Sequence, residues 1–248
     1  GISMEILEAV ARTGHLSEPL KHTKQPIVTG TSVLAVQYAD GIMMAADTLG
    51  SYGSLAKYKD LRRVRAVGSS TLIGASGEYS DFQHIISMLN DANTADFCED
   101  DGCFLGPDNI FHYMTRVLYQ RRNKQNPLWN TLVVAGVKQD GEKFLGVVDN
   151  IATAFQDKFI ATGYGEYIAM PLLRTGWEEN MSEAKARALL ETCMRTLYYR
   201  DCRTINRISF AKVTKDGPEV AEPISLETKW DYELFARPKA GADTDGSW

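Results

Sequence analysis

Residues 30–55 have the sequence GTSVLAVQYADGIMMAADTLGSYGSL, and this stretch decides the fold class. It contains two apolar runs, at residues 31–38 and 42–47, joined by a short segment that ends in Gly41. Two such runs around a glycine-bearing turn predict a β-hairpin. Both runs are apolar almost throughout instead of alternating, which is typical of strands that are covered on both faces of their sheet.

Further strands are expected where short apolar runs are bounded by turn residues. These runs lie at residues 64–67, 71–75, 131–137, 144–148, 152–159 and 207–213. A turn at residues 215–217 then leads into a last extended stretch.

Helical spacing of apolar side chains predicts four helices among these strands. The first is expected to begin at a capping box formed by residues 80–83. The second opens at Pro107 and ends at the basic residues 121–122, which suit a helix C-terminus. The other two are expected at residues 165–174 and 182–199.

The order of these elements predicts an α+β protein. Four strands, two helices, three strands, two helices and one or two final strands suggest four layers, in the order helices, sheet, sheet, helices. Periodicity alone leaves other α+β arrangements open. With 248 residues, 44% of them hydrophobic, the chain can fill one large core. We predict an N-terminal extension at residues 1–30, a single domain at 31–230 and a C-terminal tail at 231–248.

Composition argues against several classes of partner. The formal net charge is −5, with both signs intermixed, so nothing favours nucleic acid or an anionic membrane. No apolar run approaches the roughly 20 residues of a membrane-spanning helix. The basic run at residues 121–124 is better explained as a helix C-terminus or a subunit contact than as a nucleic-acid patch.

The cysteines give no sign of a metal site or a cofactor. Cys98, Cys103, Cys193 and Cys202 form no CxxC pair, and no histidine lies beside the first two. A structural metal site needs four nitrogen or sulfur ligands at usable spacing. We therefore expect reduced cysteines, no metal and no cofactor.

Several stretches carry a resemblance to a known family. Residues 30–55 resemble the opening of proteasome β-type subunits, where a threonine starts the first strand and an aspartate follows an Ala-Ala pair on the second. Four further stretches resemble one subtype, numbered seventh in the yeast scheme and fourth in the mammalian one. They are TKQPIVTG (23–30), SYGSLAKYKDLRRV (51–64), YQRRNKQNPLWN (119–130) and RTLYYRDCR (195–203).

The resemblance implies the four-layer αββα sandwich of N-terminal-nucleophile hydrolases and a set of site positions. In active family members the first residue of the mature chain is a threonine nucleophile, whose freed α-amine can accept the proton. The nucleophile position falls on Thr31 and the first aspartate on Asp47. The remaining positions are Arg63 for the lysine, Tyr164 for a serine, Asp201 for the second aspartate and Thr204 for a second serine.

Half of these positions depart from the pattern of an active site. Arginine holds its proton too tightly for proton exchange, so Arg63 does not replace a lysine. Tyr164 is far bulkier than a serine and would crowd the nucleophile. Gly30 precedes Thr31, so the amine of Thr31 is locked in a peptide bond. We expect Thr31 to be an ordinary strand residue, and Asp47 and Asp201 to be structural carboxylates.

The resemblance therefore implies a structural, non-catalytic β subunit of the 20S proteasome core, in the cytoplasm and nucleus. Its expected partners are other proteasome α and β subunits, in its own ring and in the opposing β ring. Two alternatives stay open: an active threonine peptidase subunit, and a free-standing N-terminal-nucleophile amidohydrolase.

The resemblance also implies how the two chain ends behave. A T-x-x-P stretch begins at Thr23, so we expect a neighbouring active subunit to cleave after His22 and leave Thr31 capped. The C-terminal end carries four large apolar residues, Trp230, Tyr232, Leu234 and Phe235. These either pack on their own subunit or reach into the opposing ring, and the resemblance favours the second arrangement.

Overall fold

The computed structural model describes residues 24–102 and 104–231 of the chain. Within that part the strands form two antiparallel sheets. The first has the order β10 (Ala154–Gln156), β9 (Lys143–Val148), β8 (Asn130–Val137), β7 (Thr71–Glu78), β1 (Val28–Gly30), β4 (Gly50–Tyr52), β5 (Leu55–Tyr58), and β6 (Val64–Val67) also pairs with β7. The second has the order β11 (Phe159–Ala161), β2 (Val33–Gln37), β3 (Gly41–Asp47), β12 (Ile208–Thr214), β13 (Gly217–Val220).

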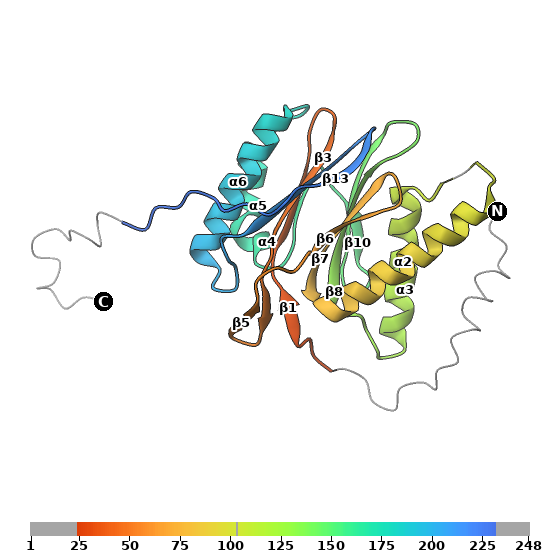
Figure 1. Ribbon diagram of the computed structural model, residues 1–248, viewed down its shortest axis with the longest axis horizontal. Coiled ribbons are helices and arrows are strands. Elements are labelled where there is room, and N and C mark those ends of the chain that lie inside the picture. Colours follow the sequence, from red (N-terminus) through yellow and green to blue (C-terminus); the bar gives the residue numbers. More distant parts are fainter. Residues whose placement is uncertain (1–23, 103, 232–248) are drawn as a thin grey trace, which may run out of the picture.

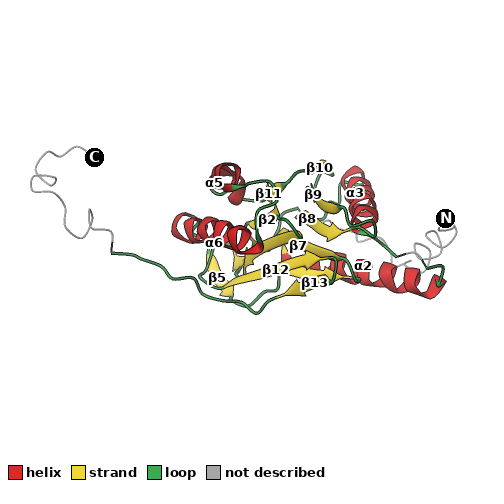
Figure 2. Ribbon diagram, turned by 90° about the horizontal axis from the view of Figure 1, so that it is seen from above, coloured by secondary structure: helices red, strands yellow, loops and turns green. Residues whose placement is uncertain are grey.

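Helices lie on both sides of the pair of sheets. Figure 1 shows α2 (Tyr79–Glu99) and α3 (Pro107–Asn123) on one side of the strands. On the other side lie α4 (Gly165–Ile168), α5 (Met170–Gly176) and α6 (Glu183–Arg200), and the view from above agrees (Figure 2). No helix of the described segments is long and apolar enough to cross a membrane.

Three apolar clusters hold these elements together. One lies between α6 and the second sheet and includes Leu34 and Leu190. Another lies between the first sheet and helices α2 and α3, and a third brings residues of both sheets together. Neighbouring residues of β2 show the division, because Val33 belongs to the cluster shared by the sheets and Leu34 to the helix-covered one. The prediction that these strands are covered on both faces is confirmed.

The decisive hairpin forms as predicted, with one difference at its start. β2 and β3 pair from Val33 opposite Ala46 to Gln37 opposite Ile42. Thr31, however, precedes β2, and residues 28–30 form β1 in the other sheet. The chain therefore crosses from the first sheet to the second at Thr31.

The predicted capping box at residues 80–83 is wrong. Helix α2 begins at Tyr79, one residue before Ser80, and Glu78 is its N-cap. The Glu78 carboxylate accepts a hydrogen bond from the Ser80 amide at 3.4 Å. A carboxylate serves as well as a serine hydroxyl here, because the first turn of a helix presents unpaired N–H groups.

Candidate active site around Thr31

Thr31 lies where the two sheets meet, beside an open hollow of about 410 Å³. Its hydroxyl donates a hydrogen bond to Oδ2 of Asp201 over 2.7 Å. The hollow is lined by Thr29, Gly30, Thr31, Gly163, Tyr164 and Arg203. The threonine at the predicted nucleophile position thus faces a hollow and contacts one of the predicted carboxylates.

Asp201 joins the end of α6 to the start of the second sheet. It is the C-cap of α6, and its amide donates to the Leu197 carbonyl at 2.7 Å. Its Oδ1 accepts the Arg203 amide at 2.9 Å while Oδ2 accepts the Thr31 hydroxyl. Asp201 is buried, so both carboxylate oxygens are used inside the fold.

Arg63 lies behind Thr31 and is almost completely buried. All five N–H groups of its guanidinium have an acceptor. These acceptors are the carbonyl oxygens of Thr31 (3.0 Å), Ser32 (3.1 Å), Asp47 (3.1 Å) and Ala75 (3.2 Å), and Oδ1 of Asp47. The side chain therefore ties β3 and β7, one from each sheet, to the junction at Thr31.

Asp47 is the anionic partner of this arginine, and its side chain is as deeply buried. Its Oδ2 also accepts the backbone amides of Leu49 and Ile205, each at 3.3 Å. Burial raises the pKa of the Asp47 carboxyl, while the Arg63 guanidinium and the two amides oppose that rise. The carboxylate oxygens of Asp47 are therefore both bonded within the protein.

Neither Arg63 nor the backbone nitrogen of Thr31 can accept the proton of a threonine nucleophile in this chain. A guanidinium keeps its proton at neutral pH, and each N–H of Arg63 is already bonded to the protein. The amine of Thr31 is part of the peptide bond to Gly30.

The residues before Thr31 are built into the first sheet. Thr29 pairs with Ser51 of β4 on one side and with Glu78 of β7 on the other. Gly30 pairs with Gly77, and a Cβ placed on Gly30 would come within 2.2 Å of the Arg63 Cδ. Strand β1 thus fills the space between β7 and β4, and only a residue without a side chain fits beside Arg63.

The two other substituted positions have different surroundings. Tyr164 is the N-cap of α4 and lines the same hollow as Thr31, with 59% of its surface exposed. Thr204 does not join the hollow, because its hydroxyl donates to the backbone carbonyls of Asp201 at 2.9 Å and Leu197 at 3.4 Å. The structure therefore gathers Thr31, Asp47, Arg63, Tyr164 and Asp201 in one region and leaves Thr204 in a turn beside it.

Sequence reasoning missed three polar residues that shape this region. Ser32 accepts the Gly165 amide through its hydroxyl at 2.7 Å, and Thr162 accepts the Val33 amide at 2.9 Å. Glu78 accepts the amides of Ile27 and Val28, which lead into β1. The sequence shows only that each of these polar residues lies near the end of a strand. Many polar residues in such positions bond to the backbone, so their position alone does not identify these three contacts. The predicted processing residues His22 and Thr23 lie outside the described residues.

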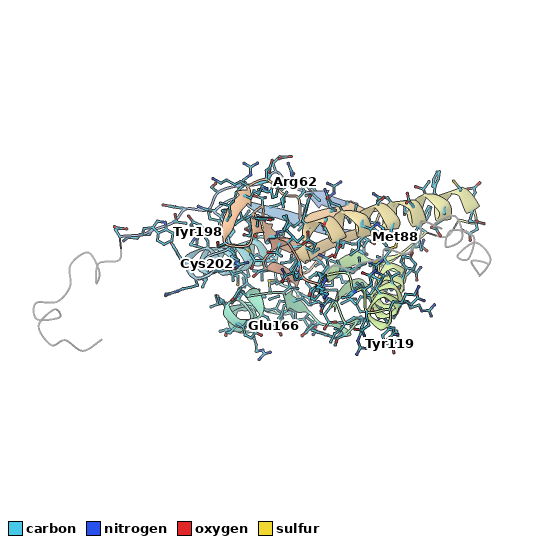
Figure 3. All side chains as sticks on the ribbon, turned by 90° about the horizontal axis from the view of Figure 1, so that it is seen from below. Arg62, Met88, Tyr119, Glu166, Tyr198 and Cys202 are labelled. Carbon is cyan, nitrogen blue, oxygen red and sulfur yellow. The ribbon has the colours of Figure 1, made fainter. Side chains whose placement is uncertain are left out.

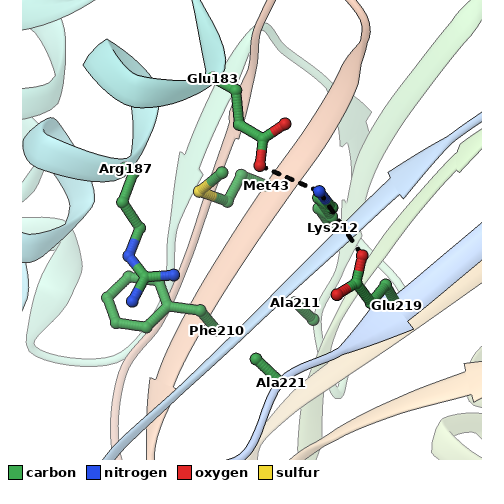
Figure 4. A pocket seen from close by; sticks show the side chains of 8 residues that line it. All are labelled: Met43, Glu183, Arg187, Phe210, Ala211, Lys212, Glu219 and Ala221. Carbon is green, nitrogen blue, oxygen red and sulfur yellow. Dashed lines mark hydrogen bonds and ion pairs between the residues drawn. The ribbon is translucent and has the colours of Figure 1, made fainter. Parts of the chain in front are cut away.

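A second, smaller depression of about 110 Å³ lies between α6 and β12–β13 (Figure 4). Lys212 lies between Glu183, at 3.0 Å, and Glu219, at 3.5 Å. Arg187 stacks on the Phe210 ring, 3.8 Å from its centroid, and bonds to Glu191. The charged side chains that line this depression are therefore paired within the protein. In the described segments no three His, Cys, Asp or Glu residues form a group that could hold a metal.

Comparison with known proteins identifies the class. The family model described as "Proteasome subunit" matches residues 27–213, and the chain belongs to this family. It is 48% identical over 248 residues to "Proteasome subunit beta type-4" of Arabidopsis thaliana, which covers 100% of this chain and 96% of that protein. It is 49% identical over 208 residues to the protein of that name from Dictyostelium discoideum, covering 83% and 80%.

A yeast relative has the number that the yeast scheme gives to the same subtype. The chain is 40% identical over 227 residues to "Proteasome subunit beta type-7" of Saccharomyces cerevisiae, covering 87% of this chain and 85% of that protein. The resemblance seen in the sequence, to the subunit numbered fourth in one scheme and seventh in the other, is confirmed.

Proposed function

We propose that this chain is a structural, non-catalytic β-type subunit of the 20S proteasome core particle. It would support assembly of the β rings for ATP- and ubiquitin-dependent protein degradation, with other proteasome α and β subunits as partners. The observation that carries the proposal is the fully bonded Arg63, which occupies the lysine position behind a Thr31 whose amine is in a peptide bond.

We also propose that this chain has the four-layer αββα sandwich, with the layers in the order helices, sheet, sheet, helices. Active and inactive proteasome subunits would share this fold. The three apolar clusters support it, since two lie between helices and a sheet and one joins the sheets. A subunit that keeps this fold without a working nucleophile would serve the particle through its contacts with other subunits.

Exposed apolar side chains support a role in subunit contact. The β4–β5 hairpin carries Tyr52, Leu55 and Tyr58 with 50%, 59% and 41% of their surfaces exposed. All four residues of β5 are exposed, and β5 ends the order of its sheet (Figure 1). Exposed apolar residues on an edge strand favour pairing with another chain. We propose that this hairpin contacts a neighbouring subunit in the ring.

The test is a substitution of Thr31 by Ala in the assembled particle. Because the proposed role needs no nucleophile, each peptidase activity of the particle should remain unchanged, while the lost bond to the buried Asp201 should reduce the subunit's stability by about 1–3 kcal/mol. Thr29→Ala is a matched control, because it changes another threonine of the same hollow. Loss of one activity in Thr31→Ala particles of normal yield, with Thr29→Ala unaffected, would contradict the proposal.

An active threonine peptidase is the second candidate, and one contact favours it. The Thr31 hydroxyl bonds to Asp201 at the edge of a hollow, as a nucleophile bonded to a carboxylate would. A mature chain that begins at Thr31 would support this candidate. A free-standing amidohydrolase would instead appear at the mass of a single chain or small oligomer in native mass spectrometry. We also propose a location in the cytoplasm and nucleus, which imaging of the tagged chain tests.

A further inference from the structure

Glu78 connects the N-terminal segment to the first turn of α2. Its carboxylate is buried, with the residue only 5% exposed. Oε2 accepts the amides of Ile27 and Val28, the latter at 3.0 Å. Oε1 accepts the amide of Ser80 at 3.4 Å and its hydroxyl at 2.8 Å. One buried carboxylate thus satisfies backbone N–H groups of two segments that lie about fifty residues apart in the sequence.

The contacts of Glu78 fall where the chain passes from exposed to buried. Lys24, Gln25 and Ile27 are exposed, residues 28–29 are half-buried, and Gly30 is buried. From Val28 onward the backbone pairs with β4 and β7. The side chain of Glu78 therefore binds the first two amides at the entrance to β1.

A protease must accommodate an extended segment, so a strand inside a sheet is cleaved only after it opens locally. Opening β1 breaks its pairing on both sides together with the two bonds to Glu78. Chain before Ile27 meets no such barrier within the described residues. The geometry points to Glu78 as the positioning residue that sets the limit of N-terminal trimming, by holding the entrance of β1 closed to a neighbouring protease.

The inference rests on the proposed function in one respect, since Thr31 must not cleave its own preceding peptide bond. It also links trimming to the β4–β5 hairpin, because that hairpin joins its sheet through β1. A chain trimmed into β1 would lose the strand that connects the hairpin to β7.

The test compares variants of the full-length chain in the assembled particle, all carrying Thr31→Ala so that self-cleavage is impossible. Glu78→Ala removes the carboxylate, and Glu78→Gln keeps its size but removes the negative charge that strengthens the hydrogen bonds to both segments. Glu166→Ala is the matched control, since this glutamate is exposed on α4 (Figure 3). Intact mass of the subunit gives its N-terminus, and hydrogen exchange gives the protection of Ile27 and Val28.

The expected N-terminus lies before Ile27 in the parent chain and in Glu166→Ala, and within residues 28–30 in both Glu78 variants. In Glu78→Gln, exchange at Ile27 and Val28 should rise about tenfold, the change expected when a hydrogen bond to a charged oxygen becomes one to a neutral oxygen, while β8 stays protected. If the N-terminus of the Glu78→Gln subunit is the same as in the parent chain, the inference is overturned, even if hydrogen exchange at Ile27 and Val28 rises. If the Glu78→Ala subunit does not assemble, the N-terminus of Glu78→Gln decides by itself. The wild-type subunit is compared with the subunit that carries Thr31→Ala. If only the wild-type subunit begins at Thr31, the proposed function is contradicted, but the role of Glu78 is not.

Discussion

Arg63 joins three parts of the chain that are distant in sequence. Its guanidinium binds carbonyl oxygens at Thr31 and Ser32, at the end of β3 and in β7, and forms a buried ion pair with Asp47. A lysine has a single ammonium group with three donors and cannot reach five acceptors. The residue that removes a catalytic lysine from the pattern is therefore the residue on which the local structure depends.

Arg63→Lys should destabilise the subunit without creating peptidase activity. At least two of the five acceptors would lose their donor, at a cost of about 1–3 kcal/mol each. Urea unfolding of the purified chain measures the loss. Arg62→Lys is the matched control, because Arg62 is more exposed and pairs with the exposed Glu222, so its effect should stay within about 0.5 kcal/mol. Equal stability of the two variants would contradict the structural role of Arg63.

Cys193 should resist alkylation in the folded subunit. Burial among apolar side chains raises the pKa of its thiol to about 12. A pH of 8 lies about four units below this pKa, so only about one molecule in ten thousand carries the reactive thiolate. Iodoacetamide followed by peptide mass analysis should label Cys98 and Cys202, which are exposed, and label Cys193 only after unfolding. Labelling of Cys193 at the rate of Cys202 would show that this core opens readily.

Strand β1 shows where sequence patterns stop being informative. The hairpin β2–β3 and the long helices α2, α3 and α6 could be predicted, since their apolar side chains repeat at the spacing of their own element. Residues 28–30 have no such repeat, and they form a strand because Gly77 and Ser51 offer backbone partners. Strands β4 and β5 were missed for a related reason, because β5 is exposed on both faces and lacks an apolar pattern.

The candidate site divides in the same way. Thr31, Asp47, Arg63 and Asp201 could be located because their positions match a family pattern, and the structure brings them together. The bonds of Glu78, Ser32 and Thr162 could not be predicted, because each depends on a backbone amide whose position only the folded chain determines. The start of α2 was misplaced for this reason also, since Glu78 and not Ser80 caps it.

Gly30→Ala tests whether β1 is fitted against Arg63. The added methyl group would lie 2.2 Å from the Arg63 Cδ, so one of the two must shift, at a cost of about 1–3 kcal/mol. Thermal unfolding of the chain measures this loss. If the clash is with Arg63, the double variant Gly30→Ala, Arg63→Ala, which removes the Cδ atom, should be more stable than the sum of the single effects predicts. Strict additivity would show that the two residues do not interact.

At the scale of the whole molecule, the last described residues pack on the domain. Trp230 packs edge-on against Tyr198 and Tyr199, with ring centroids 5.6 and 5.0 Å apart. The Lys229 amide donates to the Tyr199 hydroxyl at 2.7 Å. Figure 3 shows Tyr198 at one end of the molecule, on the same side as Cys202. Trp230 therefore packs on its own subunit, while the predicted contacts of Tyr232, Leu234 and Phe235 lie outside the described residues.

Two truncations separate fastening from contact with the opposing ring. Ending the chain after Asp231 keeps Trp230 and should give a soluble subunit that enters half-particles but joins them poorly. Ending it after Lys229 also removes Trp230 and should add a loss of about 1 kcal/mol, the order expected for an aromatic pair. Native mass spectrometry of the assembly products and thermal unfolding provide the two measurements. Full particles at normal yield from the Asp231 truncation would show that the tail is dispensable.

The central claim is that Thr31 remains capped and the subunit does no cleavage. The most direct measurement is the intact mass, with N-terminal sequencing, of this subunit isolated from the assembled particle. We predict a chain that begins upstream of β1, at Thr23 after cleavage behind His22, with Thr31 still joined to Gly30. A dominant product that begins at Thr31 would contradict the account, because its free amine would restore what an N-terminal nucleophile requires.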